Sequence, residues 1–102
     1  MIDKLEEEVE LVARHVEIFR KVVEDGPIGI VNLSNEMGYP HHKVRYSLRV
    51  LEESGFIEPT AQGAVPTEEG HEFIGEFNDR VSAIVERLRE VRLGDEQVPK
   101  AQ

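Results

Sequence analysis

The sequence predicts a mainly α-helical domain with one small β-hairpin, and three observations lead to this fold class. Residues 1–25 and 67–93 carry apolar side chains at helical spacing, which indicates a long helix near each end of the chain. Two shorter helical segments lie between them, separated by glycine and proline. Two short β-compatible runs, 56–58 and 64–65, precede the last helix and indicate a hairpin.

The composition fits one small domain. An apolar content of 39% in 102 residues allows a compact core, which a dimer would enlarge by burying further apolar surface. The absence of cysteine excludes a disulfide framework, a thiolate zinc site and a cysteine nucleophile. No apolar run is long enough to cross a membrane, and the acidic N-terminus lacks the order of a signal peptide. We therefore expect a soluble, cytoplasmic protein with no membrane partner.

The first helix is predicted over residues 2–25, where apolar residues recur at spacings of 4, 3, 4, 3 and 4. This heptad-like seam consists of Leu5, Val9, Val12, Val16, Phe19 and Val23. The seam is longer than the core of a small domain needs, which is typical of a helix that packs against a second chain. Gly26 and Pro27 end the helix, because proline cannot continue the hydrogen-bond ladder.

The middle of the chain predicts a short strand, two helices and a hairpin. Residues 28–30 are apolar and β-compatible, residues 31–37 form a short helix closed by Gly38, and Pro40 opens the next helix at its first position. That helix ends at Gly55. The two runs of the hairpin are joined by residues 59–63, in which Gly63 is available for a positive φ.

The last helix is predicted from Thr67, a good N-cap that two glutamates follow in the first turn, to about Leu93. Gly70 and Gly75 weaken its first turns by up to ~1 kcal/mol each relative to alanine. Its apolar stripe, spaced 3, 4, 3, 4 and 3, consists of Ile74, Phe77, Val81, Ile84, Leu88 and Val91. A helix of this length overhangs a small domain, so its distal apolar residues would be exposed in a monomer.

The element order is that of a winged helix-turn-helix domain with both terminal helices extended. We assign residues 1–93 to this single domain, divided into an N-terminal helix (1–25), the helix-turn-helix and wing (27–66) and a C-terminal dimerisation helix (67–93). Residues 94–102 form a tail. We expect a homodimer with coiled-coil character, held together by Leu5, Val9, Val12, Phe77, Val81, Ile84, Leu88 and Val91.

The segment from 40 to 54 is cationic in a protein of net charge −9. Between Met37 and Leu51 there is no acidic residue. Three apolar residues at i, i+4 and i+7 form one helical face, namely Val44, Leu48 and Leu51. Polar and basic side chains occupy the opposite face, as in a helix that packs on a small core and lies in a DNA major groove.

This segment and the wing resemble the MarR-, ArsR- and PadR-type regulators and small archaeal dimeric winged-helix regulators. The recognition helix and first wing strand of those families match Val44, Leu48, Leu51, Glu52, Gly55, Phe56 and Ile57. The return strand and the helix after it are similar at Val65, Thr67 and Gly70. The resemblance covers about residues 27–73. It implies a sequence-specific transcriptional regulator that binds double-stranded DNA, with the helix of about 40–54 in the major groove.

Carried over residue by residue, the resemblance implies a DNA-contacting set of His41, His42, Lys43, Arg45, Tyr46 and Arg49. Arg45 and Arg49 are candidates for base edges, because arginine binds guanine bidentately. Lys43 and His41 are candidates for phosphates, the latter because it lies near a helix N-terminus.

The wing departs from the family pattern. Residues 52–79 contain eight acidic residues and no lysine or arginine, and the wing tip offers Gln62 where the families commonly place a basic residue. Either the wing does not contact DNA, or a high-salt cytoplasm screens the repulsion, or the partner is not DNA. The alternative to a DNA regulator is therefore a winged-helix module that binds a protein.

Other chemistries receive little support from the sequence. The four histidines are not spaced to converge on a metal ion, and the serines and carboxylates form no catalytic arrangement, so we expect no metal, cofactor or enzymatic activity. An alternative interpretation of the cationic residues is an ordinary solvated face, in which Arg49 pairs with Glu53. A small-molecule effector in a crevice between the dimer helices is a third hypothesis, and no charged or aromatic cluster in the sequence marks such a crevice.

Overall fold

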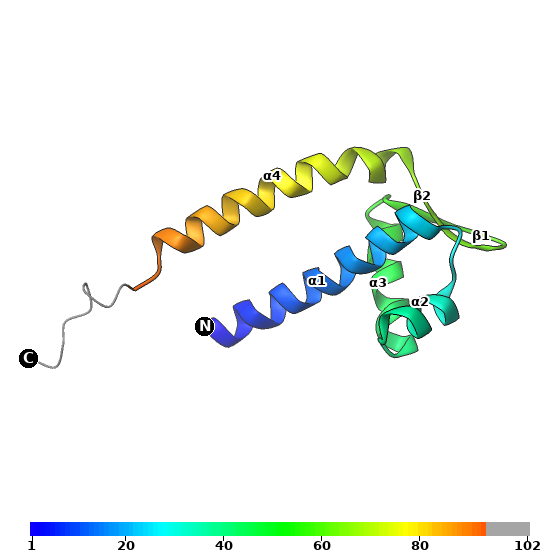
Figure 1. The fold of residues 1–102 in the computed structure, drawn as a ribbon, viewed down its shortest axis with the longest axis horizontal. Helices are drawn as coiled ribbons and strands as arrows, with labels where there is room; N and C mark the ends of the chain where they lie inside the picture. The colour runs from blue at the N-terminus through cyan, green and yellow to red at the C-terminus, as the bar shows by residue number, and fades with distance from the viewer. Residues whose placement is uncertain (94–102) are drawn as a thin grey trace, which may run out of the picture.

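The structure of the protein, a computed structural model, describes residues 1–93. Its elements are α1 (Ile2–Asp25), α2 (Ile30–Met37), α3 (His41–Glu53), β1 (Ile57–Thr60), β2 (Gly63–Pro66) and α4 (Glu68–Glu90). Figure 1 shows the second half of α1, α2, α3 and the hairpin gathered into a head, from which the first half of α1 and most of α4 extend in one direction. The predicted tail, 94–102, lies outside the described residues. The mainly helical fold with one hairpin, as in a winged helix, confirms the predicted fold class.

The core of the head is a single cluster of apolar side chains contributed by every element except α4. It consists of Ile18, Phe19, Val22, Ile28, Leu33, Val44, Leu48, Leu51, Ile57 and Ala64. The heptad pattern missed Ile18 and Val22, which have no exposed surface and form a second apolar stripe beside the seam of α1. The first half of α1 extends beyond the head (Figure 1), so the seam remains exposed at Leu5, Val9 and Val12.

The helix-turn-helix is formed by α2 and α3 and is tied to α1 by polar contacts. The ammonium of Lys21 lies 2.6 Å from a carboxylate oxygen of Asp25 and 2.8 Å from one of Glu36 on α2. These two hydrogen bonds raise the pKa of Lys21. The hydroxyl of Tyr39, in the turn between α2 and α3, donates to Glu17 at 2.7 Å. The turn itself begins at Gly38, which has a φ of +80° that glycine adopts without a steric penalty.

The wing is a two-stranded antiparallel hairpin, and its strands differ from those predicted. Residue pairing runs from Ile57 with Pro66 to Thr60 with Gly63, so the turn is only Ala61 and Gln62. The predicted strand at 28–30 is reduced to one bridge between Ile28 and Ala64, because residue 30 already belongs to α2. Pro40 is the N-cap of α3 and not its first helical residue.

The start of α4 is fixed against the end of α3. As predicted, Thr67 is the N-cap: its hydroxyl oxygen accepts from the amide of Gly70 at 2.9 Å, and the hydroxyl donates to the carbonyl of Gly55 at 2.6 Å. Gly70 lies where the helix crosses the chain closely, since a Cβ there would come 2.2 Å from the carbonyl oxygen of Phe56. The helix ends at Glu90, earlier than the predicted Leu93.

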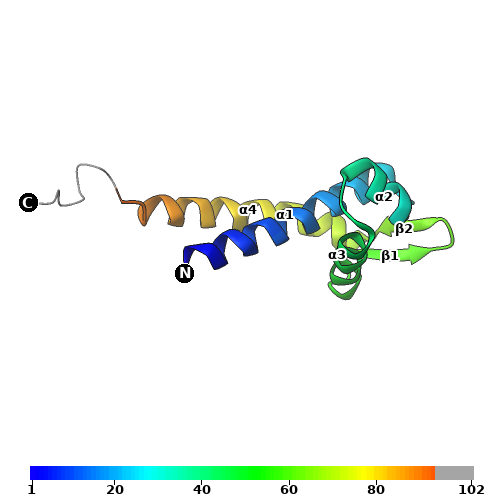
Figure 2. The ribbon, with the colours of Figure 1, turned by 90° about the horizontal axis from the view of Figure 1, so that it is seen from below.

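Beyond the head, α4 has little packed surface. Gly70 is its only buried residue, although the helix continues for 23 residues. The radius of gyration is 17.6 Å, whereas a compact chain of this length would have one near ~13 Å. Figure 2 shows the same elongation from below, with α1 running toward the head and α4 running away from it. No helix within residues 1–93 is long and apolar enough to cross a membrane.

Candidate nucleic-acid interface

The solvent-facing side of α3 carries the predicted DNA-contacting set. All six of its members, His41, His42, Lys43, Arg45, Tyr46 and Arg49, have exposed side chains. The opposite side is buried as predicted, with Val44, Leu48 and Leu51 at 0, 8 and 6% exposure. The buried apolar side of α3 therefore fixes the helix on the core, and its cationic side faces solvent. That these residues contact DNA stays a prediction.

The surroundings of the cations on α3 are unequal. Lys43 lines an open groove together with Arg14, Tyr39 and several carboxylates near the start of α1, namely Asp3, Glu6, Glu7, Glu8 and Glu10. These carboxylates offset the charge of Lys43 and oppose the approach of a phosphate from that side. Arg45 and Arg49 do not line this groove. Their charges are consequently better placed to attract an anionic ligand.

A polar contact that sequence reasoning missed joins α3 to α1. Ser47 has no exposed surface, and its hydroxyl oxygen accepts from Nε of Arg14 at 2.9 Å. The same oxygen lies 2.7 Å from Nδ1 of His15. A serine hydroxyl has one proton and two acceptor lone pairs, so Nδ1 of His15 either accepts that proton or donates to the same oxygen, according to the tautomer of the imidazole. The two adjacent residues of α1 thus satisfy the one buried polar side chain of the head.

His15 also contacts the exposed face of α3. Its ring centroid lies 5.8 Å from that of Tyr46, with the two ring planes inclined at 46°. Burial of the imidazole, and secondarily the nearby charge of Arg14, lowers the pKa of His15 below its usual 6.5. The sequence placed His15 only as a histidine on another helix. The contacts of His15 depend on how α1 crosses α3, and the residues next to His15 in the sequence do not indicate that crossing.

The wing tip contains no cation. Residues 58–62 are exposed, and Glu58 is the only charged residue among them. The turn is closed by the hydroxyl of Thr60, which donates to the carbonyl of Gly63 at 2.7 Å and accepts from the amide of Gln62 at 3.2 Å. The two-residue turn is therefore ordered by its own hydrogen bonds, and its residues, Ala61 and Gln62, offer no cation to a phosphate.

A second feature that the sequence did not mark is an aromatic cleft between α1 and α4. Four phenylalanines from distant positions contact one another in series: Phe19 with Phe56, Phe56 with Phe73 and Phe73 with Phe77, at centroid distances of 6.1, 4.1 and 5.5 Å. Three of them line a cleft of about 230 Å³ with Val16 and Val23. No cluster in the sequence marks this cleft, because tertiary contacts bring its residues together.

Within residues 1–93, no group of three or more histidine, aspartate or glutamate side chains is placed to hold a metal ion. His41 and His42 are both exposed on α3, whereas His15 faces Ser47 and His71 lies on α4. The described part of the chain thus offers a cationic helix face, an uncharged wing tip and an aromatic cleft as its distinctive surfaces.

Comparisons with known proteins point to one group of bacterial regulators. No protein-family model matches the chain. The chain is 37% identical over 76 residues to the heat-inducible transcription repressor HrcA of Listeria welshimeri and of several Listeria monocytogenes strains. The match covers 66% of this chain but 22% of each relative, so the chain spans about a fifth of the length of these relatives.

Proposed function

We propose that the chain is a sequence-specific DNA-binding transcriptional regulator that acts as a homodimer, with α3 in the major groove. The observation that carries this proposal is the exposed cationic face of α3 on a helix whose other face is buried in a winged-helix head. The similarity to HrcA supports it, because those relatives are transcription repressors. Since the match covers only part of each relative, occupancy of a promoter is the only mode of regulation that we propose.

The cations of α3 have distinct proposed roles. Arg45 and Arg49 would read base edges, because a guanidinium can bind guanine O6 and N7 together. His41 lies at the start of α3, where free backbone amides favour a phosphate. Lys43 would bind a phosphate as a point charge, weakened by the carboxylates that share its groove. His42 and Tyr46 complete the surface.

A homodimer would pair two such helices on a two-fold symmetric operator, with half-sites ~34 Å apart or a multiple of this. The predicted dimerisation residues are available for such a contact. Val9, Ile84 and Val91 are 52, 57 and 55% exposed, and Leu5, Val12, Val81 and Leu88 lie between 37 and 44%. Apolar side chains exposed along two helices of one chain favour association, because their burial is worth ~25 cal/mol per Å².

Acidic residues at the end of α3 and in β1 limit the contribution of the wing. Glu52, Glu53 and Glu58 are exposed near the strands, and no cation at the tip offsets them. Phosphates near the wing would be repelled at low ionic strength and less so at high ionic strength, where charges beyond a few ångströms are screened. We therefore assign most of the binding free energy to α3.

The test is selection from a randomised duplex library by the full chain, carried out at low salt and repeated near 1 M salt. We expect enrichment of a two-fold symmetric motif, and its loss in Arg45→Ala and Arg49→Ala proteins that keep the wild-type circular-dichroism spectrum. Binding should be saturable and should weaken as salt rises. Failure to enrich any motif at either salt would overturn the proposal and favour the second candidate, a protein-binding module, which the acidic wing supports.

A further inference from the structure

The flanks of the two apolar seams carry opposite charges. The α1 seam is Leu5, Val9, Val12, Val16, Phe19 and Val23, and the α4 seam is Ile74, Phe77, Val81, Ile84, Leu88 and Val91. The seam residues occupy heptad positions a and d, and positions e and g flank them. In the first half of α1 the charged residues at positions e and g are Glu6 and Glu8. The charged residues in the same positions of α4 are Arg80 and Arg87, and Arg92 continues the pattern just beyond its end.

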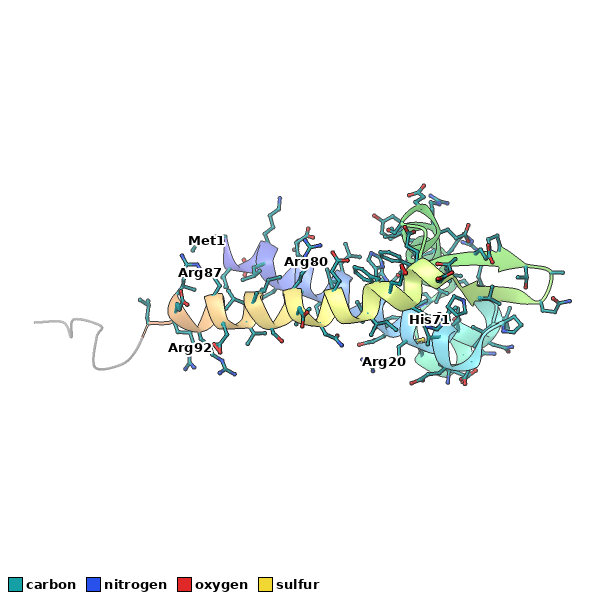
Figure 3. All side chains as sticks on the ribbon, turned by 90° about the horizontal axis from the view of Figure 1, so that it is seen from above. Met1, Arg20, His71, Arg80, Arg87 and Arg92 are labelled. Atoms are coloured by element: carbon teal, nitrogen blue, oxygen red, sulfur yellow. The ribbon has the colours of Figure 1, made fainter. Side chains whose placement is uncertain are left out.

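Arginines line both edges of the α4 seam. Figure 3 shows Arg80 and Arg87 along one edge of α4, and Arg92, just beyond the helix, on the other, at the end of the molecule where Met1 precedes α1. Their described ion pairs lie within α4: Arg80 is 3.7 Å from Glu76, and Arg87 is 2.8 Å from Glu90. Both pairs are highly exposed, and such pairs contribute little to stability. The guanidinium groups are therefore available to other carboxylates.

The two seams do not cover each other within one chain. At the head they face one another across the aromatic cleft, where Val16 and Phe19 lie opposite Ile74 and Phe77. Further out the helices remain separate, and their seam residues are exposed. The apolar stripe of α4 is also wider than one seam, because Val85 beside it is 41% exposed. A stripe of this width fits a helix that contacts two neighbours in a bundle.

We propose that a second copy of the chain covers these surfaces, with α1 of each protomer packed antiparallel against α4 of its partner. This inference rests on the proposed homodimer and specifies its pairing. Contact of α1 with its own copy would bring Glu6 and Glu8 against identical carboxylates. Contact of α4 with its own copy would bring the arginines together. Only the mixed pairing places opposite charges along the seam.

The spacing of the seams fixes the register. Steps of 4 and 3 residues from Leu5 to Val9 to Val12 match the steps from Leu88 to Ile84 to Val81 read in the opposite direction. This register sets Glu8 of one protomer beside the partner's Arg87. Both heads then lie at the same end of the bundle, so that two α3 helices can meet one duplex.

Cross-linking of cysteine variants tests the pairing, because the chain has no cysteine of its own. Full-length Glu8→Cys and Arg87→Cys proteins carry different tags, are mixed, and are treated with a short bismaleimide. We expect a mixed covalent dimer, with each variant alone giving less than a tenth of that yield. Cross-linking of either variant to itself as efficiently as in the mixture would overturn the proposal, as would a wild-type monomer in sedimentation. Neither readout needs DNA, so failure of the DNA-binding proposal is detected separately.

Charge reversal gives an independent test. We expect Glu8→Arg, or Arg87→Glu, to weaken self-association at least 10-fold, and the combination of the two changes to restore it. Matched controls are Glu7→Arg and Arg89→Glu, which lie away from the seams and should leave the dissociation constant within twofold. If each single reversal leaves self-association unchanged, these two residues do not face each other and the proposal is wrong. Circular dichroism verifies that each variant is folded.

Discussion

Nδ1 of His15 lies 2.7 Å from the hydroxyl oxygen of Ser47, and this contact joins the long first helix to the centre of the cationic helix. Ser47 is fully buried, so its hydroxyl must find partners within the protein. Both partners come from α1, since Arg14 supplies the second. The orientation of the face of α3 that we assign to DNA therefore depends on the helix that we assign to the dimer.

Acidification should destabilise the head through His15. The folded state lowers the pKa of His15, so the unfolded chain binds its proton more tightly. The stability from the neutral ring is fully present above pH ~6.5 and is lost as pH falls through the lower pKa of the folded state. The measurement is urea unfolding between pH 5 and 8 for the wild type and for His15→Gln. We expect the stability of the wild type to fall more steeply below pH 6.5.

Glutamine is the matched replacement for His15, because its side-chain oxygen can accept from Ser47 without titrating. The difference between the two curves removes the contribution of every other titrating group. Parallel curves over the whole pH range would contradict the lowered pKa of His15 in the folded state.

Replacement of Arg49 by alanine should weaken binding to the selected operator by ~1–3 kcal/mol, because a bidentate contact to a base edge is lost. The measurement is fluorescence anisotropy with the operator and with a scrambled duplex. Arg89→Ala is the control, since it removes the same charge from the exposed surface of α4. Equal losses on both duplexes would assign Arg49 to a phosphate, and no loss would remove it from the interface.

A cation at the wing tip should strengthen DNA binding if the wing lies near the backbone. Gln62 is exposed in the two-residue turn, so Gln62→Lys adds a charge without disturbing the core. We expect a higher affinity and a slope of log K against log salt that is steeper by ~1, as for one additional phosphate contact. Ser82→Lys on α4 is the control for net charge. An equal gain from both changes would show that the tip is remote from DNA.

Loss of the Thr67 hydroxyl should weaken the attachment of α4 to the head and lower the stability of the protein. The hydroxyl caps α4 through Gly70 and donates to Gly55 at the end of α3, so Thr67→Ala should cost ~1–2 kcal/mol in the free energy of unfolding. Denaturation at one fixed protein concentration measures this, because stability depends on concentration in a dimer. Thr67→Ser keeps both hydrogen bonds and should recover most of the loss. A serine variant as unstable as the alanine variant would assign the effect to the methyl group.

Replacement of Gly63, the glycine of the wing, should destabilise the protein. The φ of Gly63 is +130°, and a Cβ there would come within 2.5–2.7 Å of the backbone of Ile28. We expect Gly63→Ala to destabilise the protein by more than ~1 kcal/mol. Gly75→Ala in α4 is the matched control: it meets nothing within 4 Å and should stabilise the helix by up to ~1 kcal/mol. Shifts of the thermal unfolding midpoint in opposite directions would confirm both expectations. An unchanged midpoint in Gly63→Ala would contradict the close approach of Gly63 to the backbone of Ile28.

Local chemistry in the sequence predicted most of the elements. The range of α1 is the predicted one, because Gly26 and Pro27 end a continuous apolar pattern. The buried face of α3 was also predicted, since three apolar residues recur at helical spacing with only polar residues opposite them. The wing strands were predicted less well. Their length is set by pairing across the hairpin and by the single bridge from Ile28, and neither appears in local propensity.

The sequence by itself determined the winged-helix order, the cationic face of α3 and the two apolar seams, because each follows from residue spacing along one helix or from the residues that end it. Only the tertiary structure decided that α1 holds α3 through Ser47, and that phenylalanines from α1, the turn before β1, and α4 form a cleft. Apart from the contact of Phe73 with Phe77 within α4, those contacts join residues about 17 to 37 positions apart. Burial at such sites depends on how helices cross, and periodicity within one helix carries no information about the crossing.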